Sequence, residues 1–178
     1  MIRTRVGYAG GTTKSPTYRN LGDHTETVEI DFDPTILSYQ ELLSYYFAAH
    51  EPFGAAFSRQ YASIIFPHDA EQEQAAREAK AALEARTGRS VGTEIVMEWE
   101  FYRAEDYHQK YALQNNRALM REFELMYPDF ADIVDSTAAA RVNGFLYGCG
   151  SPAEVQALQD DLGLSPEAVA RLVRGLGG

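Results

Sequence analysis

Apolar and polar residues alternate along several segments of the chain, and this pattern predicts β-strands. The clearest segment places Val28, Ile30 and Phe32 on one face and polar or acidic residues on the other, which is typical of a half-buried strand. The strands expected from alternation or from short apolar runs cover residues 2–8, 27–33, 61–66 and 93–102.

Capping residues mark where helices should begin. Ser38 is followed three residues later by Glu41, and Asp69 by Gln72, both at the spacing of a capping box. Helices are expected over residues 38–50, 69–86 and 106–127, and a pair of short ones after the Ser-Pro pairs at 151–152 and 165–166. Because strands and helices interleave irregularly, we predict an α+β fold with a mixed or antiparallel sheet and helices on one face.

Composition and charge narrow the class of protein. The chain has 178 residues, 45% of them hydrophobic and 24% charged, which suits one globular domain with at most a small appendage. The net charge of −10 disfavours binding to nucleic acid. No apolar run approaches the roughly 20 residues of a membrane span, and the start has no apolar signal-peptide core, so we predict no membrane contact and a cytoplasmic protein.

Candidate chemistry gathers near the N-terminus, in a glycine-rich segment at 7–11 and polar segments at 16–18 and 22–26. The glycines predict either a tight turn or a close approach to a ligand, and they lack the spacing of a nucleotide-binding loop. His24 and Glu26 should share a face of a strand, where they could bind metal or transfer a proton. Zinc deaminases need a further pair of cysteines, which this chain lacks, and the other histidines are scattered. We therefore predict no metal site.

Cys149 is the single cysteine, so the 178 residues can form no internal disulfide and no all-thiolate metal site. Its setting, Tyr-Gly-Cys-Gly, is typical of a mobile thiol rather than a preorganised nucleophile. The chain also has eleven tyrosines, and tyrosines beside a glycine loop and an acid can form an aromatic pocket with polar tips.

Read together, these segments resemble the A-type peptide methionine sulfoxide reductases, which reduce the S epimer of methionine sulfoxide. The motifs that carry the resemblance occur in family order over about the first two-thirds of the chain: residues 7–11 (Gly-Tyr-Ala-Gly-Gly), 16–18, 22–26 (Gly-Asp-His-Thr-Glu), 33–34, 38–43, 50–52, 60–63 and 104–111. The resemblance implies a reductase domain at 1–128 and a C-terminal helical extension at 129–178. It also implies a ferredoxin-like two-layer sandwich.

The resemblance also implies roles for single residues. Glu26 matches the acid that protonates the sulfoxide oxygen, which calls for a carboxyl kept neutral by an apolar pocket. Tyr18 and Tyr61 match tyrosines that hydrogen-bond the same oxygen, and Cys149 is a candidate resolving thiol. No bound cofactor is expected; the implied partners are an oxidised protein or peptide as substrate and thioredoxin or another dithiol as reductant, in protein repair after oxidative stress.

The chain departs from the family pattern in two places. The Gly-Cys-Phe-Trp segment that holds the nucleophilic cysteine, together with the first strand and helix, is absent from these 178 residues, so we expect no activity unless an upstream segment exists. Loop 53–59 also lacks an Asp that helps to organise the family's site; Ser58 or Arg59 could supply other polar contacts. A non-catalytic relative that binds oxidised methionine, and a module that dimerises through an exposed sheet edge, remain the alternatives.

Overall fold

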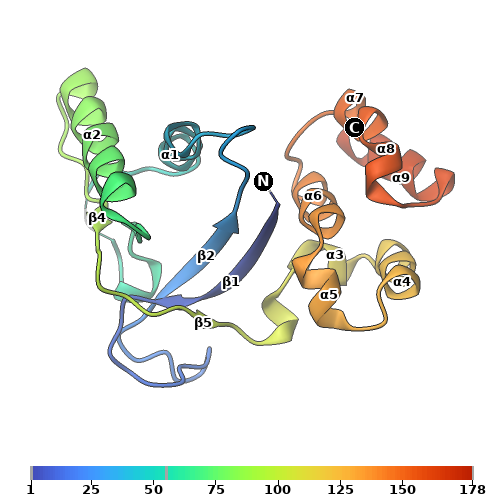
Figure 1. Cartoon of the computed structure of the whole chain (residues 1–178), viewed down its shortest axis with the longest axis horizontal. Coiled ribbons are helices and arrows are strands. Elements are labelled where there is room, and N and C mark those ends of the chain that lie inside the picture. Colours follow the sequence, from blue (N-terminus) through green and yellow to red (C-terminus); the bar gives the residue numbers. More distant parts are fainter. Residues whose placement is uncertain (1, 55, 178) are drawn as a thin grey trace. The chain divides into compact units, whose positions relative to one another are not determined.

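The computed structural model describes residues 2–54 and 56–177 and shows an α+β protein, which confirms the predicted class (Figure 1). The strands are β1 (Arg3–Ala9), β2 (Thr25–Asp31), β3 (Ile64–Ile65), β4 (Glu94–Ile95) and β5 (Tyr102–Arg103). The helices are α1 (Tyr39–Ala48), α2 (Ala70–Thr87), α3 (Tyr111–Asn115), α4 (Arg117–Met126), α5 (Phe130–Asp135), α6 (Thr137–Leu146), α7 (Pro152–Ala157), α8 (Gln159–Leu162) and α9 (Pro166–Leu176), with 3-10 turns η1 (Arg59–Tyr61) and η2 (Asp106–His108).

Packing divides the chain into two compact units. Unit 1 comprises residues 1–5, 29–32 and 105–178, and unit 2 comprises residues 6–28 and 33–104. Both candidate tyrosines and Glu26 belong to unit 2, whereas Cys149 belongs to unit 1. The predicted boundary between the domain at 1–128 and the extension at 129–178 stays a prediction, because a division into packing units does not test it.

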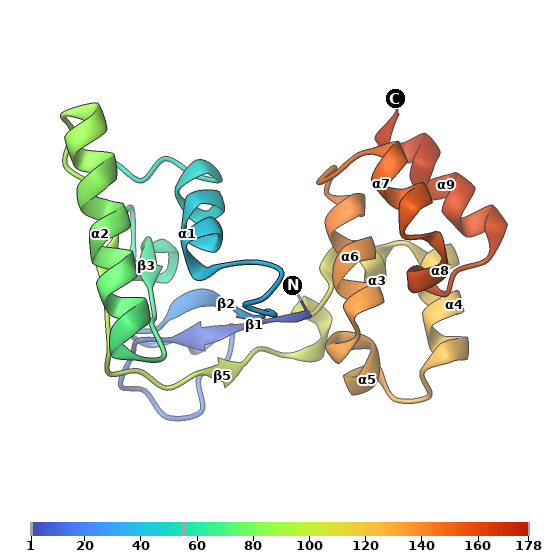
Figure 2. The same cartoon turned by 45° about the horizontal axis from the view of Figure 1, so that its top comes forward.

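Unit 2 contains helices α1 and α2, whose ends follow the sequence predictions. The side chain of Ser38 accepts a hydrogen bond from the N–H of Glu41, and the Glu41 carboxylate accepts one from the N–H of Ser38, so the capping box is confirmed. The side chain of Asp69 caps α2 by accepting from the N–H of Gln72, and Gly88 ends this helix in the left-handed region. The two helices pack with β3 around Leu43, Ile65 and Ala76 (Figure 2).

The strands are ordered β2-β1-β5 in one sheet and β3-β4 in a second, parallel pair. Strand β5 is antiparallel to β1, with Gly7 opposite Arg103 and Tyr8 opposite Tyr102. The single strand predicted over 93–102 is wrong. Its two ends pair in different sheets, and the segment between them must turn, with the indole N–H of Trp99 donating to the carbonyl of Pro67 at 2.8 Å.

Two other strand predictions also need correction. Of residues 61–66, only Ile64–Ile65 is strand, because Tyr61 ends a 3-10 turn instead. In β2, Val28 was expected on a buried face but is 53% exposed. On the opposite face, Glu29 and Asp31 are half-buried. Glu29 forms an ion pair with Arg5 of β1, and Asp31 forms one with Arg3.

Unit 1 packs helices α3 to α9 around one apolar core that includes Leu119, Phe123, Val142 and Leu172. The single long helix predicted over 106–127 is wrong: the chain forms η2, α3 and α4 in turn. Lys110, with φ of 48°, interrupts the first part, and Asn116 caps α4 by accepting from the N–H of Leu119. The two Ser-Pro helices are present as α7 and α9, and α5 and α8 were not predicted.

No helix within the described ranges is both long and apolar enough to cross a bilayer.

Candidate active site

Two glycines, Gly10 and Gly11, follow the end of strand β1, and neighbouring side chains leave no room for a Cβ at either position. Gly10 has φ of 77°, and a Cβ there would stand 2.7 Å from a ring atom of Phe66. At Gly11 a Cβ would stand 2.6 Å from the imidazole of His24. Both glycines therefore permit close packing of the chain against these rings, which favours the tight-turn interpretation of this segment.

Asp23 and His24 bind the backbone that follows these glycines. The carboxylate of Asp23 accepts hydrogen bonds from the N–H groups of Thr12 at 2.8 and 2.9 Å and of Thr13 at 3.1 Å. These bonds hold the pKa of Asp23 well below its usual range, and the bond from the Thr12 N–H has the largest effect. His24 is fully buried and binds the backbone of Gly11 and Thr13. Both of its ring nitrogens are thus used on backbone groups.

Two hydrogen bonds join Thr25 and Glu26 of β2 to the η1 turn, which contains Tyr61. The amide of Gln60 donates to the Glu26 carboxylate at 2.7 Å, and the hydroxyl of Thr25 donates to the carbonyl of Arg59 at 2.8 Å. The structure therefore joins the strand position of Glu26 to the turn that contains Tyr61, and the roles of both residues stay predictions. Gln60 is a contact that sequence reasoning missed, although it lies within a recognised motif next to Tyr61.

Tyr18 is placed by a different segment. Thr17 and Asn20 exchange two backbone hydrogen bonds, of 3.3 and 3.0 Å, so Tyr18 and Arg19 occupy the centre of a tight turn. The side chain of Tyr18 is 44% exposed, and that of Tyr61 is 60% exposed. Both phenols can therefore be reached from solvent.

The surroundings of Glu26 differ from the sequence prediction. Glu26 is exposed, so among the described residues there is no apolar enclosure that would keep its carboxyl neutral. The predicted environment is therefore wrong for the chain as described, while the predicted role stays a prediction. An exposed strand residue can become covered only by a part that packs onto it, such as a substrate or a further segment of protein.

A cavity of about 680 Å³ lies beside Tyr61, which lines it together with His50, Glu51, Ser58 and Glu94. Neither Tyr18 nor Glu26 lines this cavity, so it is not the shared pocket that the sequence predicts.

The two residues proposed in place of the missing Asp occupy different environments. The side chain of Arg59 pairs with Glu94 at 2.8 Å. The hydroxyl of Ser58 is buried and has no hydrogen-bond partner among the residues that the structure describes, and Ser58 lines the cavity beside Tyr61. Arg59 thus contributes an ion pair near the cavity, and any polar contact of Ser58 with a bound group stays a prediction.

Cys149 follows α6 and is exposed. Glycines flank it at φ of 80° and 97°, and its N–H donates to the carbonyl of Gly144 at 3.0 Å. The thiol is accessible to another protein, and its role as a resolving thiol stays a prediction.

Comparison with known proteins gives consistent results. The family described as peptide methionine sulfoxide reductase matches residues 1–134. A peptide methionine sulfoxide reductase of Drosophila melanogaster is 43% identical over 169 residues, which are 93% of this chain and 67% of the relative. Peptide methionine sulfoxide reductase A5 of rice is 37% identical over 85% of this chain and 61% of its own length.

A solved structure is also similar. Methionine sulfoxide reductase A of Corynebacterium diphtheriae superimposes with a TM-score of 0.55 at 35% identity, over 64% of this chain and 63% of that one. The chain thus spans about two-thirds or less of the length of the relatives and of the structure it matches.

Proposed function

The chain belongs to the peptide methionine sulfoxide reductase family, and from this premise we propose that it serves the reduction of the S epimer of peptide-bound, and also free, methionine sulfoxide. The substrate sulfoxide takes two electrons from two thiols. The thiols become a disulfide, the oxygen leaves as water, and methionine is the product.

Glu26 is the proton donor in this proposal, and Tyr18 and Tyr61 orient the oxygen. A thiolate attacks the sulfoxide sulfur, and the S–O bond breaks only if the oxygen is protonated as it leaves. The observation that carries the assignment is the pair of hydrogen bonds that tie Thr25 and Glu26 to the η1 turn. A proton donor and a phenol that can bind the same oxygen must approach within a few ångströms of each other, and these bonds join their two segments.

The attacking thiol has to be supplied in addition to these groups. We assign it to the Gly-Cys-Phe-Trp segment that the family resemblance implies and that these 178 residues do not contain, and we assign Cys149 the later role of resolving thiol. The same segment would complete a ferredoxin-like sheet with a further strand and helix, and it would cover the exposed Glu26 and Val28. A thioredoxin-like protein is the proposed reductant, in cytoplasmic repair of oxidised proteins.

The first experiment uses the 178-residue chain. We expect it to bind N-acetyl-methionine S-sulfoxide amide in preference to the R epimer, measured by NMR titration, and to show no turnover with dithiothreitol. Equal binding of both epimers, or no binding, would refute the proposed site. Turnover that survives Cys149→Ser would refute the assignment of the attacking thiol.

The second experiment tests Glu26 in a chimera that carries the Gly-Cys-Phe-Trp segment of a relative. We expect Glu26→Ala to slow sulfoxide reduction by about a hundredfold or more, because general-acid catalysis contributes factors of that size. Glu98→Ala, at another exposed acid, is the matched control and should leave the rate unchanged. A chimera that binds the sulfoxide but never reduces it would instead support the non-catalytic alternative.

A further inference from the structure

The segment that carries Tyr18 is a closed loop whose two ends meet at Asp23 and His24. We call residues 13–22 the Tyr18 loop; it is the first loop after β1 in Figure 1. Thr13 begins it and is bound by the carboxylate of Asp23, through its N–H and its hydroxyl, both at 3.1 Å. At the other end, the N–H of His24 donates to the carbonyl of Leu21 at 3.4 Å.

The imidazole of His24 holds the start of the loop in one defined way. Its Nε2 lies 2.7 Å from the carbonyl oxygen of Thr13, which can only accept, so Nε2 carries the proton and donates. Nδ1 is then unprotonated and accepts from the N–H of Gly11 at 3.2 Å. A single neutral tautomer satisfies both bonds, and both ring nitrogens are used on backbone groups.

Packing contacts of His24, and between the two ends of the Tyr18 loop, are consistent with these hydrogen bonds. The His24 ring lies edge-on to Tyr102 with centroids 5.4 Å apart. Gly22 has φ of 63°, and a Cβ there would stand 2.0 Å from the hydroxyl of Thr13. The two ends of the loop are thus in contact, and Pro16 is a buried anchor within it.

We propose that His24, assisted by Asp23, is a positioning residue that fixes the Tyr18 loop so that the phenol of Tyr18 is already oriented for the sulfoxide oxygen. This inference rests on the proposed function. A loop left free would have to be ordered when substrate binds, and the entropy lost at that moment weakens binding. His24 acts only through the loop, since its two nitrogens are occupied and its ring is fully buried.

The test is a double-mutant cycle on binding of N-acetyl-methionine S-sulfoxide amide to the 178-residue chain. His24→Leu removes both ring hydrogen bonds, and we expect it to weaken binding about tenfold or more, because the freed loop must then be ordered when substrate binds. His24→Gln, which can place an amide N–H toward the Thr13 carbonyl, should restore part of the affinity. In a Tyr18→Phe background, His24→Leu should have little further effect, because no phenol remains to be oriented.

Matched controls separate positioning from general destabilisation. His68→Leu changes an exposed histidine of the same unit and should leave binding unchanged. Hydrogen exchange of the Asn20 N–H, which is bonded to the carbonyl of Thr17, should accelerate in His24→Leu while exchange in α2 stays slow.

The outcomes distinguish this inference from the function on which it rests. If the unsubstituted chain fails to bind the S-sulfoxide, the proposed function is refuted and this inference with it. If that chain binds but His24→Leu weakens binding equally with and without the Tyr18→Phe substitution, or leaves Asn20 exchange unchanged, the positioning role alone is refuted.

Discussion

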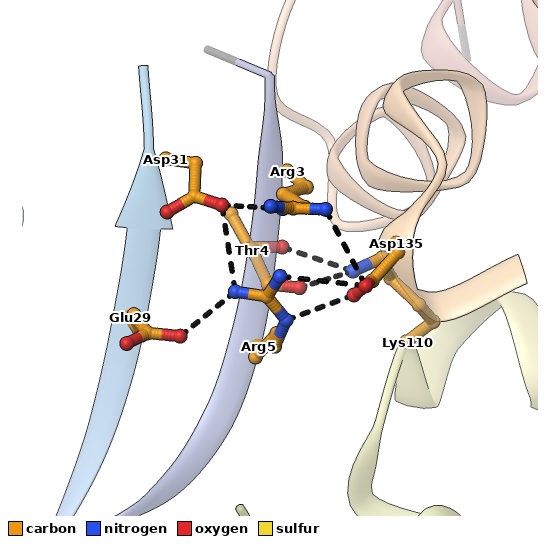
Figure 3. Close-up of polar contacts among 7 residues, drawn as sticks. All are labelled: Arg3, Thr4, Arg5, Glu29, Asp31, Lys110 and Asp135. Carbon is orange, nitrogen blue, oxygen red and sulfur yellow. Dashed lines mark hydrogen bonds and ion pairs between the residues drawn. The ribbon is translucent and has the colours of Figure 1, made fainter. Parts of the chain in front are cut away.

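Asp135 at the end of α5 pairs with both arginines of a charged network in unit 1 (Figure 3). Its carboxylate accepts from Nε of Arg5 at 2.8 Å and from Nη1 of Arg3 at 3.4 Å. Arg5 also pairs with Glu29 at 2.8 Å. The hydrogen bond to Asp135 is the largest cause that raises the pKa of Arg5 above its usual value.

The size of the effect of Asp135→Asn follows from the exposure of the partners. Fully exposed ion pairs contribute about 0–1 kcal/mol, and breaking a buried one costs about 3–5 kcal/mol. The Arg5 side chain is 17% exposed and that of Asp135 is 37% exposed, so the pair lies between these limits. Because Glu29 still compensates Arg5, we expect a loss of about 1–2 kcal/mol, or about 3–6 °C in Tm.

Urea unfolding followed by circular dichroism measures this loss, since unit 1 is rich in helix. Glu73→Gln is the control: it breaks the Arg77–Glu73 pair on α2, whose side chains are 57% and 27% exposed, and should cost about 0.5 kcal/mol or less. The difference between the two variants should shrink in about 1 M salt. A loss in Asp135→Asn no greater than in Glu73→Gln would refute the reasoning.

Three further predictions concern the described helices and loops. Gly88→Ala should cost about 1–2 kcal/mol from left-handed backbone strain alone, because among the described residues no atom beyond its chain neighbours lies within 4 Å of the added Cβ; an unchanged Tm would contradict this. Burial raises the pKa of Tyr39 to about 12. In a spectrophotometric titration of the tyrosines, Tyr39→Phe should therefore remove an ionisation step near pH 12. The stability linked to that neutral phenol is present below pH 10.0 and lost as pH rises toward 12. Bonds from Thr12 lower the pKa of Asp23, so the stability it contributes is present above about pH 4 and lost as pH falls through the lowered native value. The fall in urea midpoint between about pH 6 and pH 3 should accordingly be shallower in Asp23→Asn.

The cysteine and glutamate assignments could be made from sequence only through resemblance. The motif at 22–26 points to a site, but nothing in it tells which of its residues face a substrate and which hold the backbone. The structure separates them: Asp23 and His24 bind the preceding loop, and Thr25 and Glu26 bind the η1 turn. The family resemblance also implied an apolar setting for Glu26, whereas this residue is exposed. Exposure depends on every segment that packs nearby, and a residue pattern on one strand does not contain that information.

Local sequence determined the helix ends at Ser38, Asp69 and Gly88, because a cap is completed by atoms within four residues of the chain. Only the tertiary structure decided that residues 93–102 turn between two strands. The start of this segment, β4, pairs with β3 in one sheet, and its end enters β5, which pairs with β1 in another. It likewise decided the single tautomer of His24, because the groups that fix the two ring nitrogens lie more than ten residues earlier in the chain. Bonds that close over short separations can be read from neighbouring residues, whereas bonds between distant segments exist only once the chain has folded.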